Sequence, residues 1–94
     1  MKVLVQYTAQ LRAAVGRSEE EVELPEKCSL ADLLSHLSAK SDRSAQSHLV
    51  TETGQTRLSL LLVLNGLMVS VPEARGTPLR AGDVITLMPP IAGG

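Results

Sequence analysis

The chain has 94 residues, a formal net charge of −1 and a sequence pI of about 6.1. We therefore expect one domain with a single core. The small net charge predicts no strongly basic surface for binding nucleic acid or an anionic membrane. No apolar run approaches the roughly 18–20 residues of a membrane span, and the first residues lead straight into a strand-like segment, so we expect a cytoplasmic protein.

Few side chains offer catalytic or metal-binding chemistry. Cys28 is the one cysteine, which rules out an internal disulfide and a cysteine-based metal cluster. No paired base accompanies it, so we interpret it as a bystander thiol. His36 and His48 show no ligand spacing and are expected to be solvated. Tyr7 is the only aromatic residue, which excludes base-stacking surfaces and aromatic cages.

The first elements are predicted to form a strand pair joined by a short helical turn. Apolar and more polar residues alternate from residue 2, which predicts a strand whose apolar face carries Val3, Val5 and Tyr7. Residues 9–16 form a helical turn or loop closed by a glycine. A second alternating run at 21–24 predicts a half-buried strand that ends at a proline.

A helix should follow. Ser29 is a favourable N-cap, and Asp32 three residues later completes a signature similar to a capping box. Apolar residues then recur at the spacing of one helical face: Leu30, Leu33, Leu34 and Leu37. We expect this stripe to pack on the sheet as the largest block of the core.

The second half of the chain is predicted to contain a long connection, a hairpin and a closing strand. Residues 38–57 are polar and form a surface connection with room for a short helix. The run 58–64 is too apolar for a surface element. Asn65-Gly66 follows it and is the strongest short-range hairpin signal. An irregular bridge at 72–78 leads to a last strand at 84–88.

This order of elements predicts an α+β roll in which one main helix packs across a mixed sheet of four to five strands. The last strand should lie beside the first in the centre of the sheet. Residues 1–88 would form the domain, and the remaining six residues would leave it as an arm.

The arm consists of Pro89, Pro90, Ile91, Ala92, Gly93 and Gly94. Two prolines fix φ and favour a stiff, extended segment, which at roughly 3.1 Å per residue reaches about 19 Å. The terminal glycines lack Cβ and can enter a narrow channel. The Gly94 carboxylate is then an unhindered acyl group, but it is ionised at neutral pH and needs another enzyme to activate it.

Several short motifs occur in order along nearly the whole chain: Arg12-Ala13-Ala14-Val15-Gly16, Ser41-Asp42-Arg43, Val63-Leu64-Asn65-Gly66 with Val69-Ser70, Pro78-Leu79-x-x-Gly82-Asp83, and the terminal Pro-Pro-Ile-Ala-Gly-Gly. With this set the chain resembles the ubiquitin-like sulfur-carrier proteins, and among them it is most similar to the small subunits of molybdopterin synthase. The resemblance implies a ubiquitin-like β-grasp fold.

The resemblance also implies a mechanism. A ubiquitin-activating-like adenylyltransferase would use ATP to adenylate Gly94, and a persulfide donor would convert the adenylate to a thiocarboxylate. The arm would then enter the large subunit of molybdopterin synthase and donate sulfur for the molybdenum cofactor, with Gly93 letting it fit. The chain itself would be a non-catalytic small subunit that binds no cofactor.

By the same resemblance, Met68 and Met88 face the partner enzymes from the sheet surface, together with the arm residues 89–92. Arg12 would pair with acidic groups on a partner. Two features depart from the family pattern. An aromatic residue is common in place of Met88, and the segments 44–57 and 71–77 are longer than usual.

Three other functions stay open at this point. The chain could be a related sulfur carrier for thiamine, cysteine or tRNA thiolation. It could be a ubiquitin-like protein modifier whose Gly94 forms isopeptide bonds with lysines, which predicts a ladder of conjugates. It could also be an interaction module with an idle tail, in which case removing both glycines would change nothing.

Overall fold

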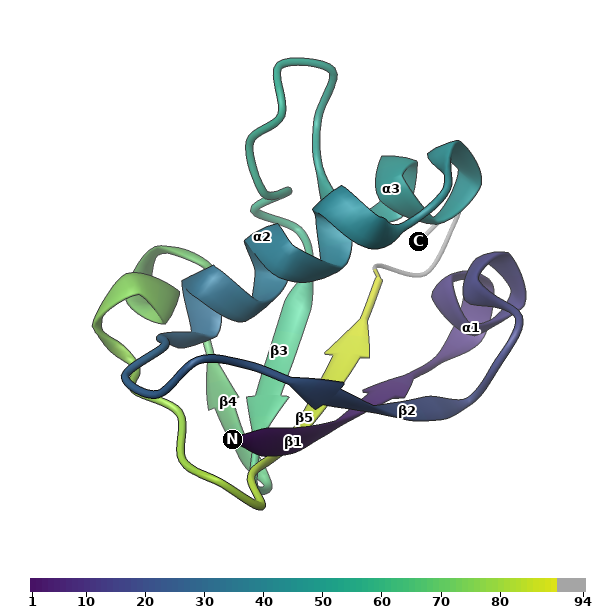
Figure 1. The fold of residues 1–94 in the computed structure, drawn as a ribbon. Helices are drawn as coiled ribbons and strands as arrows, with labels where there is room; N and C mark the ends of the chain where they lie inside the picture. Colours follow the sequence, from purple (N-terminus) through teal and green to yellow (C-terminus); the bar gives the residue numbers. More distant parts are fainter. Residues whose placement is uncertain (90–94) are drawn as a thin grey trace.

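The computed structural model describes residues 1–89 and shows a five-stranded mixed sheet with its main helix packed across one face (Figure 1). The strand order is β2-β1-β5-β3-β4. The strands are β1 (Lys2–Tyr7), β2 (Glu19–Glu23), β3 (Leu61–Leu64), β4 (Leu67–Val69) and β5 (Val84–Met88). The helices are α1 (Ala9–Val15), α2 (Leu30–Lys40), α3 (Arg43–Leu49) and the short 3-10 helix η1 (Pro72–Gly76).

The central pair confirms the expected position of the last strand. β5 runs parallel to β1, with Leu4 opposite Val84 and Tyr7 opposite Leu87. On its other side β5 pairs with β3 in the antiparallel sense. Parallel neighbours require a crossover connection, and here the chain between β1 and β5 supplies it with α2. The C-terminal end of the described chain therefore leaves from the middle of the sheet.

The pleat divides the sheet into an inner and an outer face. The inner face points toward α2, and its buried side chains are Val3, Val5, Tyr7, Val22, Leu62, Ile85 and Leu87. The outer face carries the alternate residues of the same strands: Leu4, Gln6, Leu61, Val63, Met68, Val84, Thr86 and Met88. Neighbouring residues of one strand thus have opposite environments.

Helix α2 confirms both the predicted cap and the predicted leucine stripe. The Asp32 amide donates to Ser29 Oγ over 3.1 Å, and the Ser29 amide donates to Asp32 Oδ2 over 2.8 Å. These reciprocal bonds satisfy two amides that the helix leaves without an intrahelical partner. All four leucines are buried in the core, at about 1.5–3 kcal/mol each.

The predicted Asn-Gly hairpin is also confirmed. Asn65 and Gly66 have φ values of 50° and 86° and join β3 to β4. Positive φ at both positions matches the right-handed twist of the paired strands. The Asn65 side chain adds a contact to the sheet, because its Oδ1 accepts from the Val84 amide over 2.9 Å.

The structure changes the prediction for the apolar run 58–64. Strand β3 begins only at Leu61; Leu58 is 75% exposed and Leu61 is 42% exposed. The expectation that the run is buried as a whole is wrong, because Leu60 and Leu62 take the inward positions and Leu61 falls on the outer face. The connection 38–57 contains α3, which agrees with the short helix allowed there, whereas the bridge at 72–78 is more regular than predicted because it contains η1.

Candidate functional site at the sheet end and outer face

The segment that leads to the predicted arm is anchored at the end of β5. Thr8 Oγ1 donates to the Leu87 carbonyl over 3.1 Å, and the Pro89 side chain is buried. The hydrogen bond ties the end of the central strand to the start of α1. The predicted site residues Pro90, Ile91, Ala92, Gly93 and Gly94 lie outside the described residues.

The two predicted interface methionines lie on the same face of the sheet. Met68 is 69% exposed and stands opposite Val63, whereas Met88 is half-buried and stands opposite Leu61. With Leu61 they make the β3–β4–β5 part of the outer face apolar. Arg12 is exposed on α1 and so belongs to a helix, not to this face.

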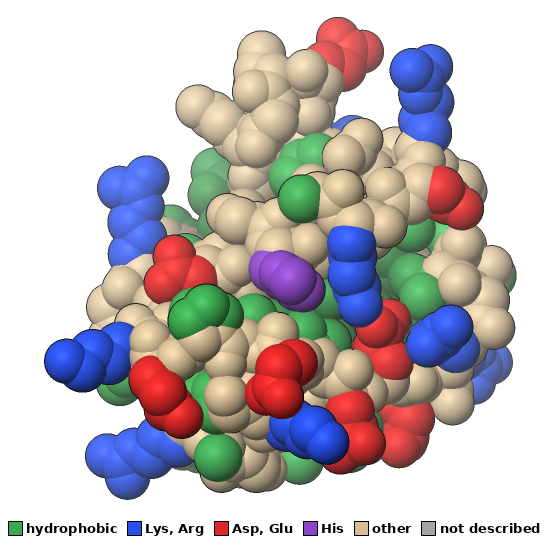
Figure 2. Space-filling view, in the orientation of Figure 1, with side chains coloured by type: hydrophobic (Ala, Val, Ile, Leu, Met, Phe, Trp, Pro, Cys, Tyr) green, Lys and Arg blue, Asp and Glu red, His purple; other side chains and the backbone are tan. Residues whose placement is uncertain are grey.

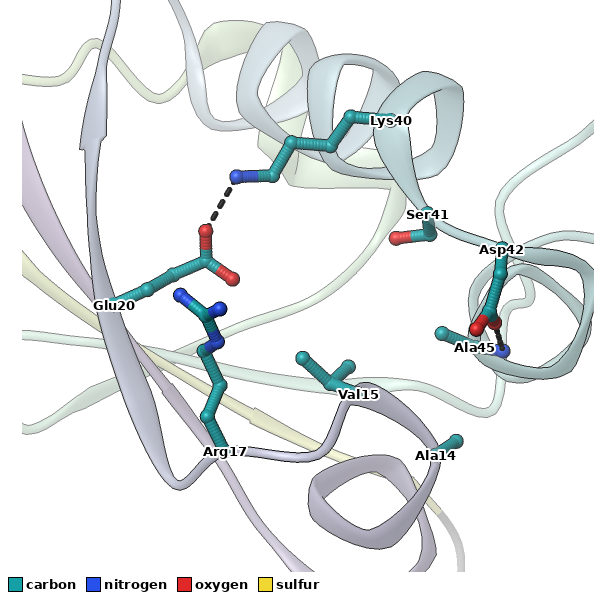
Figure 3. Close-up of a pocket in the computed structure, with 8 residues that line it drawn as sticks. All are labelled: Ala14, Val15, Arg17, Glu20, Lys40, Ser41, Asp42 and Ala45. Carbon is teal, nitrogen blue, oxygen red and sulfur yellow. Dashed lines mark hydrogen bonds and ion pairs between the residues drawn. The ribbon is translucent and has the colours of Figure 1, made fainter.

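A second group of polar side chains gathers in a recess of about 400 Å³ at the junction of α1, β2, α2 and α3 (Figure 3). Lys40 Nζ donates to Glu20 Oε1, and Tyr7 Oη donates to Glu20 Oε2 over 2.9 Å. Figure 3 shows the Arg17 guanidinium pointing toward the same carboxylate. Glu20 is therefore the centre of this group, and it links β1 and β2 to the C-terminal end of α2.

The charges of this group suit a structural ion pair. Partial burial tends to raise the pKa of Glu20, but hydrogen bonds from Lys40 and Tyr7 and the charges of Lys40 and Arg17 lower it overall. Burial raises the pKa of Tyr7, and its bond to the Glu20 carboxylate raises it further. At neutral pH Glu20 is ionised and Tyr7 is protonated, so neither side chain is poised for proton transfer.

Sequence reasoning did not find this ion pair. A signal was present, because strand alternation places Glu20 on the same side as Val22, where a charge needs a cationic partner. The partner, Lys40, is twenty residues away and carries no signal of its own. Within residues 1–89, no group of His, Cys, Asp and Glu is arranged to hold a metal ion. In the same range, every helix is too short or too polar to cross a bilayer.

The strand order, the parallel central pair and the crossing helix define a ubiquitin-like β-grasp protein. The chain belongs to the ThiS family, whose match covers residues 5–94. This range includes both terminal glycines.

Three similar proteins illustrate the breadth of the likeness. Small archaeal modifier protein 3 of Haloferax volcanii is 27% identical to this chain over 94 residues, and the alignment covers both proteins in full. The SAMP1 structure from Haloferax volcanii has a TM-score of 0.85 at 22% identity, with both chains fully covered. The putative molybdopterin converting factor subunit 1 of Pyrococcus furiosus has a TM-score of 0.71 at 29% identity, covering 97% of this chain and 99% of that one.

These likenesses support a sulfur carrier of the ThiS type or a small archaeal modifier, and they single out no pathway. The predicted fold family is confirmed. The narrower prediction of a molybdopterin synthase subunit is one of several outcomes that the likenesses allow.

Proposed function

We propose that this chain is a carrier that acts through its C-terminal carboxylate, either as a sulfur donor or as a covalent modifier of other proteins. The observation that supports this proposal is the family match, which continues through Gly93 and Gly94 to the end of the chain. The β-grasp domain would serve as a rigid handle, since the segment leading to the glycines begins at the central strand.

The proposed chemistry begins with activation by a partner. The Gly94 carboxylate attacks the α-phosphate of ATP on a ubiquitin-activating-like adenylyltransferase, which releases pyrophosphate and leaves an acyl adenylate. The outer sulfur of a persulfide donor then displaces AMP and forms an acyl disulfide. A second thiol of the donor attacks the donor-side sulfur of that disulfide, so that a donor disulfide forms and the Gly94 thiocarboxylate leaves. Gly93 is proposed to let this end of the chain fit a narrow active site, because it adds no Cβ. ATP is used by the partner and is not a resident cofactor of this chain.

Two fates of the activated end follow from the similar proteins. The likeness to a small archaeal modifier favours a related carrier or modifier, whose activated Gly94 passes sulfur on or forms isopeptide bonds. The likeness to a molybdopterin converting factor subunit supports a second candidate: sulfur donation to a pterin precursor within a molybdopterin synthase large subunit. Both use the same terminal carbonyl. Isopeptide formation transfers its acyl carbon to a lysine amine, whereas sulfur donation transfers the sulfur from that carbon to the acceptor.

Partner docking is proposed for the apolar part of the outer face. Met68 and Leu61 are exposed there, and Met88 lies beside Leu61. Flexible, polarisable thioethers adapt to more than one partner surface. An activating enzyme and an acceptor enzyme could therefore use this face in turn.

The test is the intact mass of N-terminally tagged protein purified gently from its native cells. A mass with one oxygen replaced by sulfur establishes the carrier, and a ladder of heavier conjugates establishes the modifier. Adding one residue after Gly94, or replacing Gly93 with tryptophan, should abolish both products while leaving the unfolding free energy unchanged. The matched control is the same single residue added at the N-terminal tag. Full activity of the extended chain would overturn the terminal-carboxylate mechanism.

A further inference from the structure

A groove of about 600 Å³ lies on the helical side of the molecule, between α2, η1 and the segment that precedes β3. This segment projects from the body and folds back on itself through a bridge between Val50 and Thr56 (Figure 1). Figure 2 shows this side of the molecule, with hydrophobic side chains exposed beside the base of the projection. The groove is thus distinct from the outer face and from the recess around Glu20.

The lining of the groove combines apolar side chains with a smaller number of polar ones. Ala31 and Leu34 of α2 contribute from the helix, and Pro72 and Ala74 contribute from the η1 side. Leu58 also lines it and is 75% exposed, so a large apolar side chain remains open to solvent at the groove. A volume of this size lies within the roughly 300–1,000 Å³ of typical ligand sites.

The two side walls come from separate connections of the chain. Residues 54–56 form one wall, and residues 71–75 contribute the other. They are far apart in the sequence and line the groove together with α2. The groove is therefore a product of the tertiary fold.

One charge marks the groove. Arg75 is the single charged residue in its lining, it is exposed, and it takes part in no salt bridge within the described part of the chain. The nearby carboxylate of Glu73 accepts from the Ser70 amide over 3.1 Å and from the Ser70 hydroxyl over 2.8 Å. An apolar groove with one unpaired guanidinium is complementary to an apolar side chain beside a carboxylate.

We propose that this groove binds a segment of another protein that presents a leucine-sized side chain next to an acidic residue. The apolar side chain would cover Leu58 and the α2 floor, and the carboxylate would pair with Arg75. The groove and the outer face lie on opposite sides of the sheet, so the two surfaces can be occupied together. This proposal does not depend on the chemistry proposed for Gly94.

The test uses a capped tetrapeptide, acetyl-Asp-Leu-Leu-Asp-amide, titrated into the isotopically labelled full-length chain and followed by two-dimensional NMR. We expect saturable shifts of the amides of Ala31, Ser35, Thr56 and Ala74. Replacing both aspartates by lysine, or both leucines by serine, should weaken binding at least tenfold. A Leu58→Ser variant should weaken binding similarly. Leu67→Ser is the matched control, because Leu67 is 74% exposed but does not line the groove.

Reversing the charge of Arg75 distinguishes lost recognition from lost folding, because only a folded groove can exchange its preference for one peptide against another. An Arg75→Glu variant should lose the acidic peptide and gain the lysine peptide, whereas Arg80→Glu, an exposed residue outside the groove lining, should change neither. The proposal is overturned if the groove amides show no saturable shifts or if Arg75→Glu leaves the preference unchanged. It is also overturned if the groove signals broaden with protein concentration alone, since a second copy of this chain would then be the occupant.

Discussion

The inner and outer faces of the sheet use the same strands for different tasks. On the inner face the side chains of the three central strands are buried against α2, and on the outer face the alternate positions are half-buried or exposed. Leu62 and Leu61 are sequence neighbours, yet the first is 0% exposed and the second 42%. The fold therefore buries its inner face more completely than its outer face, where docking of partners is proposed.

The largest expected effect comes from truncating the same residue type on the two faces. Leu62→Ala should lower the free energy of unfolding by about 2–5 kcal/mol, because it opens a cavity in the core. Leu61→Ala, one residue away on the outer face, should lower it by less than about 1 kcal/mol. Urea unfolding of both variants measures the difference. Equal losses would mean that the outer face also stabilises the fold.

The second prediction concerns binding. Met68→Asp should weaken affinity for the activating enzyme at least tenfold, since it places a charge in the proposed apolar docking surface. The unfolding free energy should change by less than about 1 kcal/mol, because Met68 is 69% exposed. Leu67→Asp is the control, as the neighbouring side chain belongs to the other side of β4. Calorimetric titration of each variant with the enzyme measures the affinity. If Met68→Asp binds the enzyme as tightly as the unchanged protein does, the outer face is not the docking surface.

The smallest effect concerns the inner face at high pH. Tyr7 has a pKa raised above its ordinary value of 10.0, so the folded state holds this proton more tightly than the unfolded state. Stability should be unaffected by Tyr7 below about pH 10 and should fall as the pH rises above it. Tyr7→Phe should lose about 0.5–1.5 kcal/mol at neutral pH but show a shallower alkaline decline. Denaturant unfolding between pH 7 and 10.5 compares the two slopes, and identical slopes would exclude Tyr7 as the cause.

Much of the fold could be predicted because its signals are local. Ser29 and Asp32 are three residues apart, and the cap they form depends on that spacing alone. Asn65-Gly66 likewise determines its own turn. The position of β5 beside β1 followed from the order of elements and the apolar character of both strands.

The features that were missed all depend on distant contacts. Leu58 was expected to be buried from the composition of its run, but its exposure depends on where the chain turns into β3. The bond between Glu20 and Lys40 joins an edge strand to the end of a helix. The apolar groove with Arg75 forms where two separate connections meet on α2.

The sequence by itself determined the periodicity of the strands, the start and apolar face of α2, and the hairpin turn. Each of these rests on interactions within a few residues, which the order of side chains specifies directly. Only the tertiary structure decided which face of the sheet stays open, which carboxylate finds a lysine and where a groove remains. Those outcomes depend on how α2 and the long connections pack over the sheet, and packing joins residues that local patterns do not relate.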